Sequence, residues 1–443
     1  MIHLSYDRGS VIVRGDIATP YGHWDPRIGA FRAMALYYHE LKSFLDGSGV
    51  PYVDDVPALL PISGLKSKLN LRPYQEDALK AWVNAGKRGV IVLPTGAGKT
   101  FIALKAIELL NLPTLIVVPT IDLIDQWKKN LVSQFNQDVG ALGGGEERVE
   151  ALTVSTYDSA ALRAEKLGNM FMFLVFDEVH HLPAPTYSQI AEMYIAPFRM
   201  GLTATYERED GAHKDLPRLM GGKVFEVDVD SLIGKHLSSY TYEKVWVELT
   251  SQEKEEYRRE YAFFTDYLRN RGLTLRSPRD FQRFIMRTGR DLEARKALLA
   301  RNRALRIVLN SEAKIEALGK YLTSGRDEKS LIFTRYNELV YAISKHFLVP
   351  AITYKTQKEE RREILEKFRA GLYRAVVTSQ VLDEGIDVPD ASAAYILSGS
   401  GSSREYIQRL GRILRKKEGK EAKLVEFVAK ETVETRISQR RHR

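Results

Sequence analysis

A glycine-rich turn between an apolar run and a helical stretch is the feature that most constrains the fold of this chain. The run GVIVLP occupies residues 89–94, the turn LPTGAGKT spans 93–100, and FIALKAIELL (101–110) has the composition of a helix. Gly96 and Gly98 allow the backbone to curl so that its N–H groups face one point. The amino end of a helix adds a positive dipole end. The arrangement predicts a phosphate-binding turn in a parallel α/β sheet.

The residues of the turn predict how a nucleotide would be held. Lys99 can reach the β and γ phosphates, and the Thr100 hydroxyl can ligate Mg²⁺. Thr95 and Ala97 complete the cradle. The strict form of the pattern begins with glycine, whereas Leu93 stands there, although the GxGKT half is intact. An ordinary glycine-rich turn is the alternative, and the strand before it and the helix after it argue against that interpretation.

An acidic pair supplies the partner of this turn. The run FMFLVFD (171–177) ends in Asp177, which Glu178 follows. An acidic pair at the end of a strand is usually a solvated strand terminus. With a phosphate-binding turn in the same domain, we expect Asp177 to hold Mg²⁺ through its water shell and Glu178 to orient or deprotonate a water molecule. His180 is a candidate link to the next motif, and His181 a structural neighbour.

Continuous apolar runs alternate with helical stretches in two separate regions, as in parallel sheets covered on both faces. The first region, at 64–236, contains the runs at 89–94, 114–119, 151–155, 171–177 and 200–205, and the second, at 237–443, contains those at 330–335, 375–379 and 394–398. We therefore expect an α/β fold with two parallel-sheet domains. The two halves could be a duplicated fold.

Two further regions differ from this pattern. Residues 1–60 predict a small domain with short strands around a turn at Arg8-Gly9, and with a helix over 27–49 closed by Gly47. Residues 252–303 are charged and aromatic, and predict a helical insertion. In each region the aromatic side chains have two interpretations, packing or a contact with nucleic acid, and packing is the plainer one. They are Tyr6, Trp24, Tyr37 and Tyr38 in the first region and Tyr257, Tyr261, Phe263, Phe264 and Tyr267 in the second.

Composition narrows the class of protein. The 443 residues carry a formal net charge of +9, which is compatible with a polyanionic partner. The absence of cysteine excludes disulfides and cysteine-ligated metal sites in this chain. The polar N-terminus is not a signal peptide, and no apolar run approaches the ~20 residues that a membrane helix needs. We expect a soluble, cytoplasmic protein.

With LPTGAGKT and DEVH (177–180) in place, the chain resembles a superfamily 2 helicase, and the other motifs follow in order from Leu71 to Arg415. LRPYQ (71–75) resembles the adenine-sensing motif, with Arg72 and Gln75 as the base contacts. The remaining resemblances are VVPTIDLIDQW (117–127) to motif Ia, VSTYDS (154–159) to the next DNA-facing motif, LTAT (202–205) to motif III, IFTRY (332–336) to motif IV, VTSQVLDEGIDVP (377–389) to motif V and YIQRLGRILR (406–415) to motif VI.

Within that superfamily the chain resembles the XPB type. Arg208-Glu209-Asp210 follows motif III, where XPB-type enzymes carry an Arg-Glu-Asp element used in DNA unwinding. The resemblance implies a helical thumb at 252–303, a damage-recognition-like domain at 1–60, and a short archaeal-like form.

The resemblance also implies a mechanism. ATP would lie between two RecA-like domains, with Arg412, Arg415 and Gln408 facing it from the second, and motif V, with Asp383, Glu384, Gly385 and Asp387, would couple hydrolysis to movement. DNA would be held by Thr120, Ser155, Thr156 and Thr378, and the Arg-Glu-Asp element would act as a wedge. Changing its three residues to alanine is expected to spare ATP hydrolysis and to reduce unwinding.

Three functions remain open at this stage. The first is a 3′ to 5′ DNA helicase acting in repair or transcription, and the second is a translocase on duplex DNA that does not separate strands. The third is a nucleotide-switched scaffold that recruits a repair nuclease. Archaeal relatives of the XPB type imply a nuclease partner. An RNA helicase is disfavoured, since the acidic motif is DEVH and not DEAD.

Overall fold

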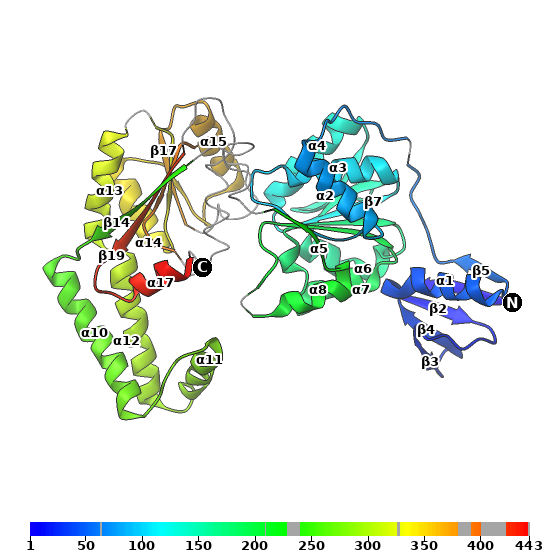
Figure 1. The fold of residues 1–443 in the computed structure, drawn as a ribbon, viewed down its shortest axis with the longest axis horizontal. Helices are drawn as coiled ribbons and strands as arrows, with labels where there is room; N and C mark the ends of the chain where they lie inside the picture. Colours follow the sequence, from blue (N-terminus) through cyan, green and yellow to red (C-terminus); the bar gives the residue numbers. More distant parts are fainter. Residues whose placement is uncertain are drawn as a thin grey trace. The chain divides into compact units, whose positions relative to one another are not determined.

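The computed structural model describes residues 1–62, 64–208, 210–227, 240–325, 328–379, 391–399 and 422–441. Its contacts divide the chain into two compact units, with the first spanning Met1–His236 and the second beginning at Leu237 (Figure 1). The first unit contains a small N-terminal domain and a motor domain. The second contains another motor domain and a helical insertion.

The N-terminal domain is a five-stranded sheet, in the order β3-β4-β2-β1-β5, with one α-helix. Its elements are β1 (Ile2–Asp7), β2 (Ser10–Arg14), β3 (His23–Asp25), β4 (Ala30–Met34), α1 (Tyr38–Ser48) and β5 (Tyr52–Asp55). Arg8 and Gly9, at the turn between β1 and β2, have φ angles of 45° and 84°. Two left-handed residues give a turn whose twist suits a hairpin, so the expected turn at this position is confirmed.

The helix expected over 27–49 is wrong in its start and in its closing glycine. Residues Ala30–Met34 form β4, which pairs with β2 and β3, and the α-helix begins only at Tyr38. It ends at Ser48 and is capped by Gly49, with φ 69°, and not by Gly47. The stretch FRAMAL suits either a strand or a helix, because it is too short to distinguish the two-residue period of a strand from the 3.6-residue period of a helix. Pairing with two neighbouring strands decided the outcome.

The first motor domain has an eight-stranded sheet in the order β13-β6-β12-β11-β7-β10-β8-β9. Its strands are β6 (Arg88–Val92), β7 (Thr114–Val118), β8 (Val139–Gly143), β9 (Glu146–Arg148), β10 (Leu152–Thr156), β11 (Phe173–Asp177), β12 (Phe198–Thr203) and β13 (Lys223–Glu226). Its α-helices are α2 (Pro73–Asn84), α3 (Lys99–Leu110), α4 (Ile121–Phe135), α5 (Tyr157–Leu162), α6 (Ala164–Leu167), α7 (Pro185–Met193) and α8 (Leu216–Met220). All pairings except that of β8 with β9 are parallel.

The second motor domain has a six-stranded parallel sheet in the order β14-β19-β18-β15-β17-β16. Its strands are β14 (Tyr240–Val247), β15 (Ser330–Phe333), β16 (Ala351–Ile352), β17 (Ala375–Thr378), β18 (Ala393–Ile396) and β19 (Ala422–Ala429). The helices described around it are α13 (Glu312–Ser324), α14 (Asn337–Phe347), α15 (Lys358–Arg369) and α17 (Glu434–Arg441).

The two motor domains share one strand order. If β6, β7, β8, β10, β11 and β12 are numbered from one to six along the chain, the first sheet runs 1-6-5-2-4-3. Numbering β14 to β19 in the same way gives 1-6-5-2-4-3 again. The extra strands β13 and β9 lie at the two edges of the first sheet. The identical order supports a duplicated fold and makes β11 and β18 counterparts.

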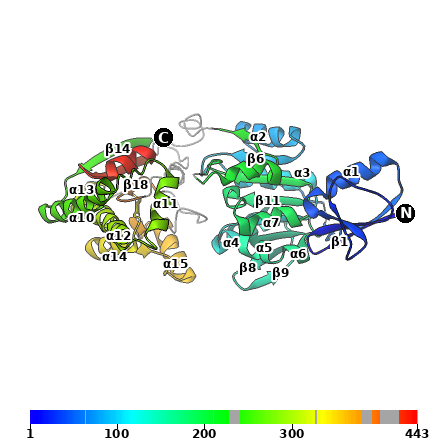
Figure 2. The same cartoon turned by 90° about the horizontal axis from the view of Figure 1, so that it is seen from below.

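The helical insertion follows β14. It consists of α10 (Ser251–Asn270), α11 (Pro278–Arg287) and α12 (Leu292–Leu309), and α10 and α12 lie side by side with α11 beyond them (Figure 1 and Figure 2). Phe264 and Tyr267 are buried in a small core with Phe284. Tyr257 is buried at the base of the insertion, whereas Phe263 is 45% exposed. Most of its aromatic side chains therefore form the core of the insertion.

Candidate active site

The glycine-rich turn lies between β6 and α3, at the carboxyl edge of the first parallel sheet. Gly96 and Gly98 have φ angles of 85° and 78°, in the left-handed region that favours glycine. Lys99 is the first residue of α3, and its Nζ donates a hydrogen bond to the Leu93 carbonyl at 3.1 Å. The turn thus has the conformation that its sequence pattern predicts.

The hydroxyl of Thr95 shows how well this turn suits a phosphate. Its Oγ1 atom is buried and has no hydrogen-bond partner among the described residues. A buried hydroxyl without a partner costs free energy, and a phosphate oxygen would accept a hydrogen bond from it. Lys99 and Thr100, both half-buried, stand beside it at the amino end of α3. These groups fit a nucleotide phosphate with its Mg²⁺.

Helix α2 holds the turn from the other side. The Tyr74 hydroxyl and the Gln75 Nε2 both donate to the Ala97 carbonyl, at 2.7 and 2.9 Å. The Gln75 Oε1 accepts from the backbone N–H of Arg72 at 2.9 Å, and Gln75 is 3% exposed. A Cβ atom at Gly98 would lie 2.5 Å from Gln75 Nε2, so the close approach requires glycine. Gln75 is thus committed to the turn in this structure.

Asp177 ends β11 and is almost fully buried. Its Oδ2 accepts a hydrogen bond from the Trp127 indole Nε1 at 3.0 Å, and its Oδ1 accepts from the backbone N–H of Glu178 at 3.1 Å. Burial, together with the negative charge of Glu178, raises the pKa of the Asp177 carboxyl. The two hydrogen bonds therefore hold the carboxylate in one orientation. Its burial makes the ionised form less favourable than it would be in water.

Glu178 has a strained backbone. Its φ of 50° lies in the left-handed region, which a non-glycine residue rarely adopts. The Tyr157 hydroxyl donates to the carbonyls of Asp177, at 3.0 Å, and of Glu178, at 3.4 Å. The Glu178 Oε2 lies 3.5 Å from His180 Nδ1 and makes no hydrogen bond in the described structure. An acceptor oxygen of this kind can receive a proton from a water molecule.

His180 joins the acidic motif to the end of β12 and, through Arg208, to the loop that follows it, as expected. Its Nδ1 lies 3.0 Å from Thr203 Oγ1, and the guanidinium of Arg208 donates to the His180 carbonyl. Two further bonds pair Arg208 with Asp210, at 3.0 and 2.6 Å, and hold the pKa of Asp210 below its usual range. His181 packs its ring 5.7 Å from the Tyr157 ring, as a structural neighbour. Arg208 is thus bound to the acidic motif.

The hydroxyl residues expected at DNA have different environments. Thr120 precedes α4, and its buried Oγ1 has no hydrogen-bond partner among the described residues. Ser155 is fully buried and donates to the Thr156 carbonyl at 3.0 Å, while Thr156 accepts from the Ser159 N–H at 3.2 Å. Thr378, also buried, donates to the Ser379 carbonyl at 2.9 Å. The same kind of local bond, from a hydroxyl to the carbonyl of the next residue, thus lies at the carboxyl ends of the counterpart strands β10 and β17.

Other predicted site residues lie outside the described part of the chain. They are Glu209 of the Arg-Glu-Asp element, Asp383, Glu384, Gly385 and Asp387 of motif V, and Gln408, Arg412 and Arg415 of motif VI. Their roles stay predictions.

Three aromatic residues that hold the site were not assigned from the sequence. Tyr74, Trp127 and Tyr157 all lie within motifs that the sequence displays, and each directs its polar tip to the turn or the acidic pair. A buried tyrosine or tryptophan needs a partner for its polar tip. An aromatic residue within a polar motif was therefore the available signal.

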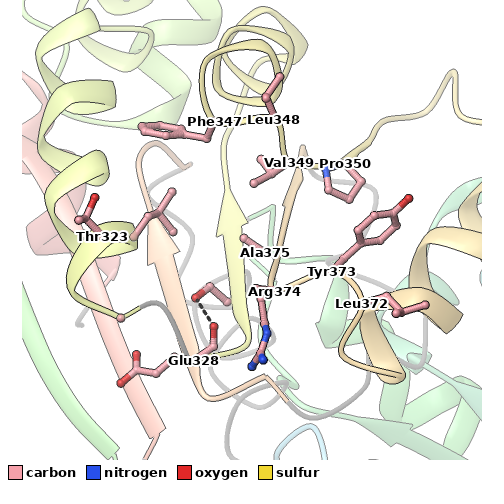
Figure 3. Close-up of a pocket in the computed structure, with 13 residues that line it drawn as sticks. Thr323, Glu328, Phe347, Leu348, Val349, Pro350, Leu372, Tyr373, Arg374 and Ala375 are labelled. Atoms are coloured by element: carbon pink, nitrogen blue, oxygen red, sulfur yellow. Dashed lines mark hydrogen bonds between the residues drawn. The ribbon is translucent and has the colours of Figure 1, made fainter.

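A pocket of about 350 Å³ lies elsewhere, in the second motor domain (Figure 3). Ser330 and Ala375, which line it, are the first residues of β15 and β17, and Pro350 precedes β16. The pocket is therefore at the amino edge of the parallel sheet. Parallel α/β sheets bind nucleotides at their carboxyl edge, so this pocket is not a counterpart of the nucleotide site.

Comparison with known families covers most of the chain. Residues 4–56 match the Xeroderma pigmentosum group B helicase damage recognition domain. Residues 68–208 match the type III restriction enzyme res subunit, and residues 313–417 match the helicase conserved C-terminal domain. A protein of Sulfurisphaera tokodaii named DNA 3′-5′ translocase XPB2 is 46% identical over 441 residues, covering 100% of both chains.

The chain belongs to the XPB family of superfamily 2 helicases. A putative DNA 3′-5′ helicase Rad25 of Haloarcula marismortui is 31% identical over 85% of the chain, and the DNA 3′-5′ helicase XPB of Mycobacterium tuberculosis is 30% identical over 86%. The chain spans 55% and 65% of these two relatives. The helicase domain of Pyrococcus furiosus Hef covers 84% of the chain at 20% identity, with a TM-score of 0.53, and shares the fold.

These findings confirm the expected family and the α/β fold with two parallel-sheet motor domains. Enzymes with such motor domains use ATP, generally with Mg²⁺, and XPB-family helicases bind DNA. Within the described residues, no helix combines the length and the apolar character needed to cross a membrane.

Proposed function

We propose that this chain is an ATP-driven DNA motor of the XPB type, a 3′ to 5′ helicase or translocase that opens or remodels duplex DNA in repair or transcription. One observation carries the proposal. Strands β6 and β11 flank β12 in a parallel sheet, so the phosphate-binding turn and the acidic pair follow the carboxyl ends of two strands that are one strand apart. This juxtaposition is what hydrolysis of a nucleoside triphosphate requires.

The residues of the first motor domain have separate tasks in this proposal. Lys99 binds the phosphates, and Thr100 and Asp177 hold Mg²⁺, which neutralises charge on the phosphate oxygens when bound. Glu178 orients the attacking water and accepts its proton. Arg72 and Gln75 contact the adenine base, and Gln75 also holds the phosphate-binding turn through the Ala97 carbonyl. Gly385 and Asp387 of motif V complete the nucleotide site.

Motif VI contributes the opposing charges in this proposal. Arg412, Arg415 and Gln408 face the γ phosphate from the second domain, where the planar guanidinium neutralises charge as it develops. ATP moves the domains only by binding one arrangement more tightly than the other. Removing an arginine of this kind lowers kcat by ~10³-fold or more in related NTPases.

DNA binding in this proposal depends mainly on backbone phosphates. Thr120 offers an unpartnered hydroxyl, whereas Ser155, Thr156 and Thr378 use theirs locally and would instead shape the loops that carry N–H groups. Arg276, Arg279, Arg283 and Arg290, in and beside α11, have exposed side chains. Binding of this kind falls steeply with salt and is insensitive to sequence.

The Arg-Glu-Asp element has a second task beyond that of a wedge. Because Arg208 donates to the His180 carbonyl, we infer that the loop communicates with the acidic motif. Replacing Arg208, Glu209 and Asp210 together by alanine should then lower ATP hydrolysis as well as unwinding, in contrast to the expectation from sequence. Unwinding lost with hydrolysis intact would support the wedge alone.

The decisive experiment is phosphate release by the full chain with and without DNA. We expect DNA to stimulate hydrolysis, and Lys99→Ala to abolish it while leaving DNA binding intact. A wild-type chain that binds ATP and DNA but releases no phosphate would favour the nucleotide-switched scaffold. Strand displacement from forked DNA separates a helicase from a translocase, which would displace only a third strand from a triplex.

A repair nuclease is the protein partner that we propose, on family resemblance. Measurement of nuclease activity with and without this chain and ATP on forked DNA tests the pairing. Unchanged cleavage would count against it.

A further inference from the structure

Trp127 joins two parts of the first motor domain that have different proposed tasks. Its Nε1 donates to Oδ2 of Asp177 at 3.0 Å, and Trp127 is 1% exposed, so water does not compete for this bond. The other carboxylate oxygen is bound to the backbone N–H of Glu178. Among the described residues each oxygen thus has one fixed donor, and only the bond from Trp127 comes from a distant part of the chain. The rotation of the carboxylate therefore depends on where Trp127 lies.

Helix α4 places Trp127 with respect to the proposed DNA contact. Helix α4 is labelled in Figure 1. It begins after Thr120, whose buried hydroxyl has no partner in the described structure, and Trp127 is its seventh residue. Trp127 lies six residue steps after Ile121, so at ~1.5 Å per residue the two are about 9 Å apart along the helix axis. Leu123, Ile124 and Leu131 bury one face of the helix in the core. A helix packed in this way moves as a unit, so a shift at Thr120 also shifts Trp127.

Tyr157 makes a second contact of a different kind. It follows Thr156, is 2% exposed, and donates to the backbone carbonyls of Asp177 and Glu178. Tyr157 thus supports the strained backbone of the acidic pair, whereas Trp127 orients the Asp177 side chain. The side-chain bond can change without unfolding the backbone, which makes Trp127 the adjustable contact.

We propose that Trp127 is a positioning residue through which DNA at the amino end of α4 changes the orientation of Asp177 and hence the rate of ATP hydrolysis. The inference rests on the proposed function, because it requires a chain that binds both DNA and ATP. DNA favours the position of α4 in which the indole N–H turns the carboxylate for Mg²⁺, and without DNA that position is less populated. Binding at one site typically changes the affinity of a coupled site by a factor of about 5–150.

The test is Trp127→Phe, which keeps an aromatic ring and removes the indole N–H. We expect DNA-stimulated turnover to fall on the order of tenfold, which is the loss of one hydrogen bond to a charged group. Turnover without DNA should fall less, so the ratio of the two rates collapses. KM for ATP should change less than kcat, because the phosphate-binding turn is untouched.

Trp82→Phe is the matched control. Trp82 is also fully buried in the first motor domain, and its Nε1 donates to the Arg199 carbonyl at 2.9 Å, away from the acidic pair. Its replacement should lower the melting temperature while the stimulation ratio stays at the wild-type value. A loss of stability by itself would therefore not imitate the expected effect.

The outcomes separate this inference from the proposed function. If wild-type chain shows no stimulation by DNA, the proposed function fails and the inference with it. If wild-type stimulation is intact and Trp127→Phe keeps the ratio within about twofold, only the inference is overturned. An equal fall of both rates also overturns it, because Trp127 would then only maintain the site.

A second measurement leaves position 127 unchanged. The chain has four tryptophans, and Trp24→Phe, Trp82→Phe and Trp246→Phe together leave Trp127 as the sole indole fluorophore. Adding DNA without nucleotide should change its emission, with saturation at the concentration that saturates DNA binding by anisotropy. Unchanged emission while DNA is bound would overturn the proposal.

Discussion

At the residue scale, the acidic pair has unfavourable features that its proposed chemistry explains. Asp177 is a buried carboxylate with a raised pKa, and Glu178 has a left-handed backbone. Strain of this kind costs ~1–3 kcal/mol and persists only where neighbouring groups support it. Trp127 and Tyr157 supply that support. We therefore expect the site to contribute to activity at the expense of stability.

Asp177→Asn tests this expectation. The folded protein holds the Asp177 proton more tightly than the unfolded chain does, so the wild-type free energy of unfolding falls as pH rises from about 4 through the raised pKa. The amide does not titrate, although its NH2 group cannot accept the second of the two hydrogen bonds that the carboxylate accepts. In the absence of Mg²⁺ and nucleotide, the stability of the variant relative to wild type should therefore be roughly 1–3 kcal/mol more favourable at pH 7.5 than at pH 4. Thermal melts at both pH values measure this difference.

Two results would complete or contradict that prediction. Turnover of ATP by Asp177→Asn should fall by at least ~10²-fold, as expected for a residue that holds Mg²⁺. A difference in melting temperature between variant and wild type that is the same at pH 4 and pH 7.5 would show that burial of the carboxylate carries no stability cost.

At the element scale, a buried ion pair joins four elements of the second motor domain. Lys314 of α13 and Glu434 of α17 are fully buried, and Lys314 Nζ lies 2.7 Å from both carboxylate oxygens. Lys314 also donates to the Leu397 carbonyl after β18, and the Ala429 N–H of β19 donates to Glu434. The bonds satisfy both charges at the carboxyl edge of the sheet, where motif VI follows β18 in the chain.

Lys314→Met should destabilise the second motor domain by ~3–5 kcal/mol, because it leaves a buried carboxylate without its partner. Lys314→Met with Glu434→Leu should recover most of that loss, since no charge then remains buried. Calorimetry of the full chain follows the transition of this domain. Lys254→Met is the control, because its pair with Glu431 is exposed and contributes below about 1 kcal/mol. A double variant no better than Lys314→Met would contradict the argument.

At the scale of the whole molecule, the N-terminal domain is attached to the first motor domain by close contacts. The Tyr6 hydroxyl donates to the carbonyls of Ala164, at 3.1 Å, and of Met193, at 3.0 Å. A Cβ atom at Gly168 would lie 2.0 Å from the Tyr6 hydroxyl oxygen and 2.1 Å from the Met193 carbonyl oxygen, which accepts its hydrogen bond. Position 168 has no room for a side chain, and this explains the glycine, because its backbone φ angle is one that any residue can adopt. The tyrosine thus packs on the motor domain, the plainer of its two interpretations.

Gly168→Ala should therefore loosen the N-terminal domain from the first motor domain. We expect faster limited proteolysis within residues 57–70, together with a lower melting temperature. Tyr6→Phe should have a smaller effect in the same direction, since it removes two hydrogen bonds and keeps the ring. Gly47→Ala is the control, because a Cβ atom there meets no atom within 4 Å. Proteolysis unchanged by Gly168→Ala would contradict this attachment.

The sequence by itself determined the family, the α/β class and the local form of the phosphate-binding turn. These properties depend on residues close together in the chain, such as Gly96, Gly98 and Lys99, whose spacing the chemistry of a phosphate requires. The strand β4 shows the limit of such patterns. A short apolar stretch suits either period, and only pairing with β2 and β3 decided between them.

The tertiary structure alone decided which distant side chains meet. Trp127 and Asp177 are 50 residues apart, and Lys314 and Glu434 are 120 residues apart. From the sequence alone, each of these side chains has an ordinary interpretation, as a core aromatic residue or as a solvated charge. The strand order shared by the two motor domains was likewise hidden, because their residues differ while their packing agrees. Contacts of this range depend on how whole elements pack, which no local pattern of residues records.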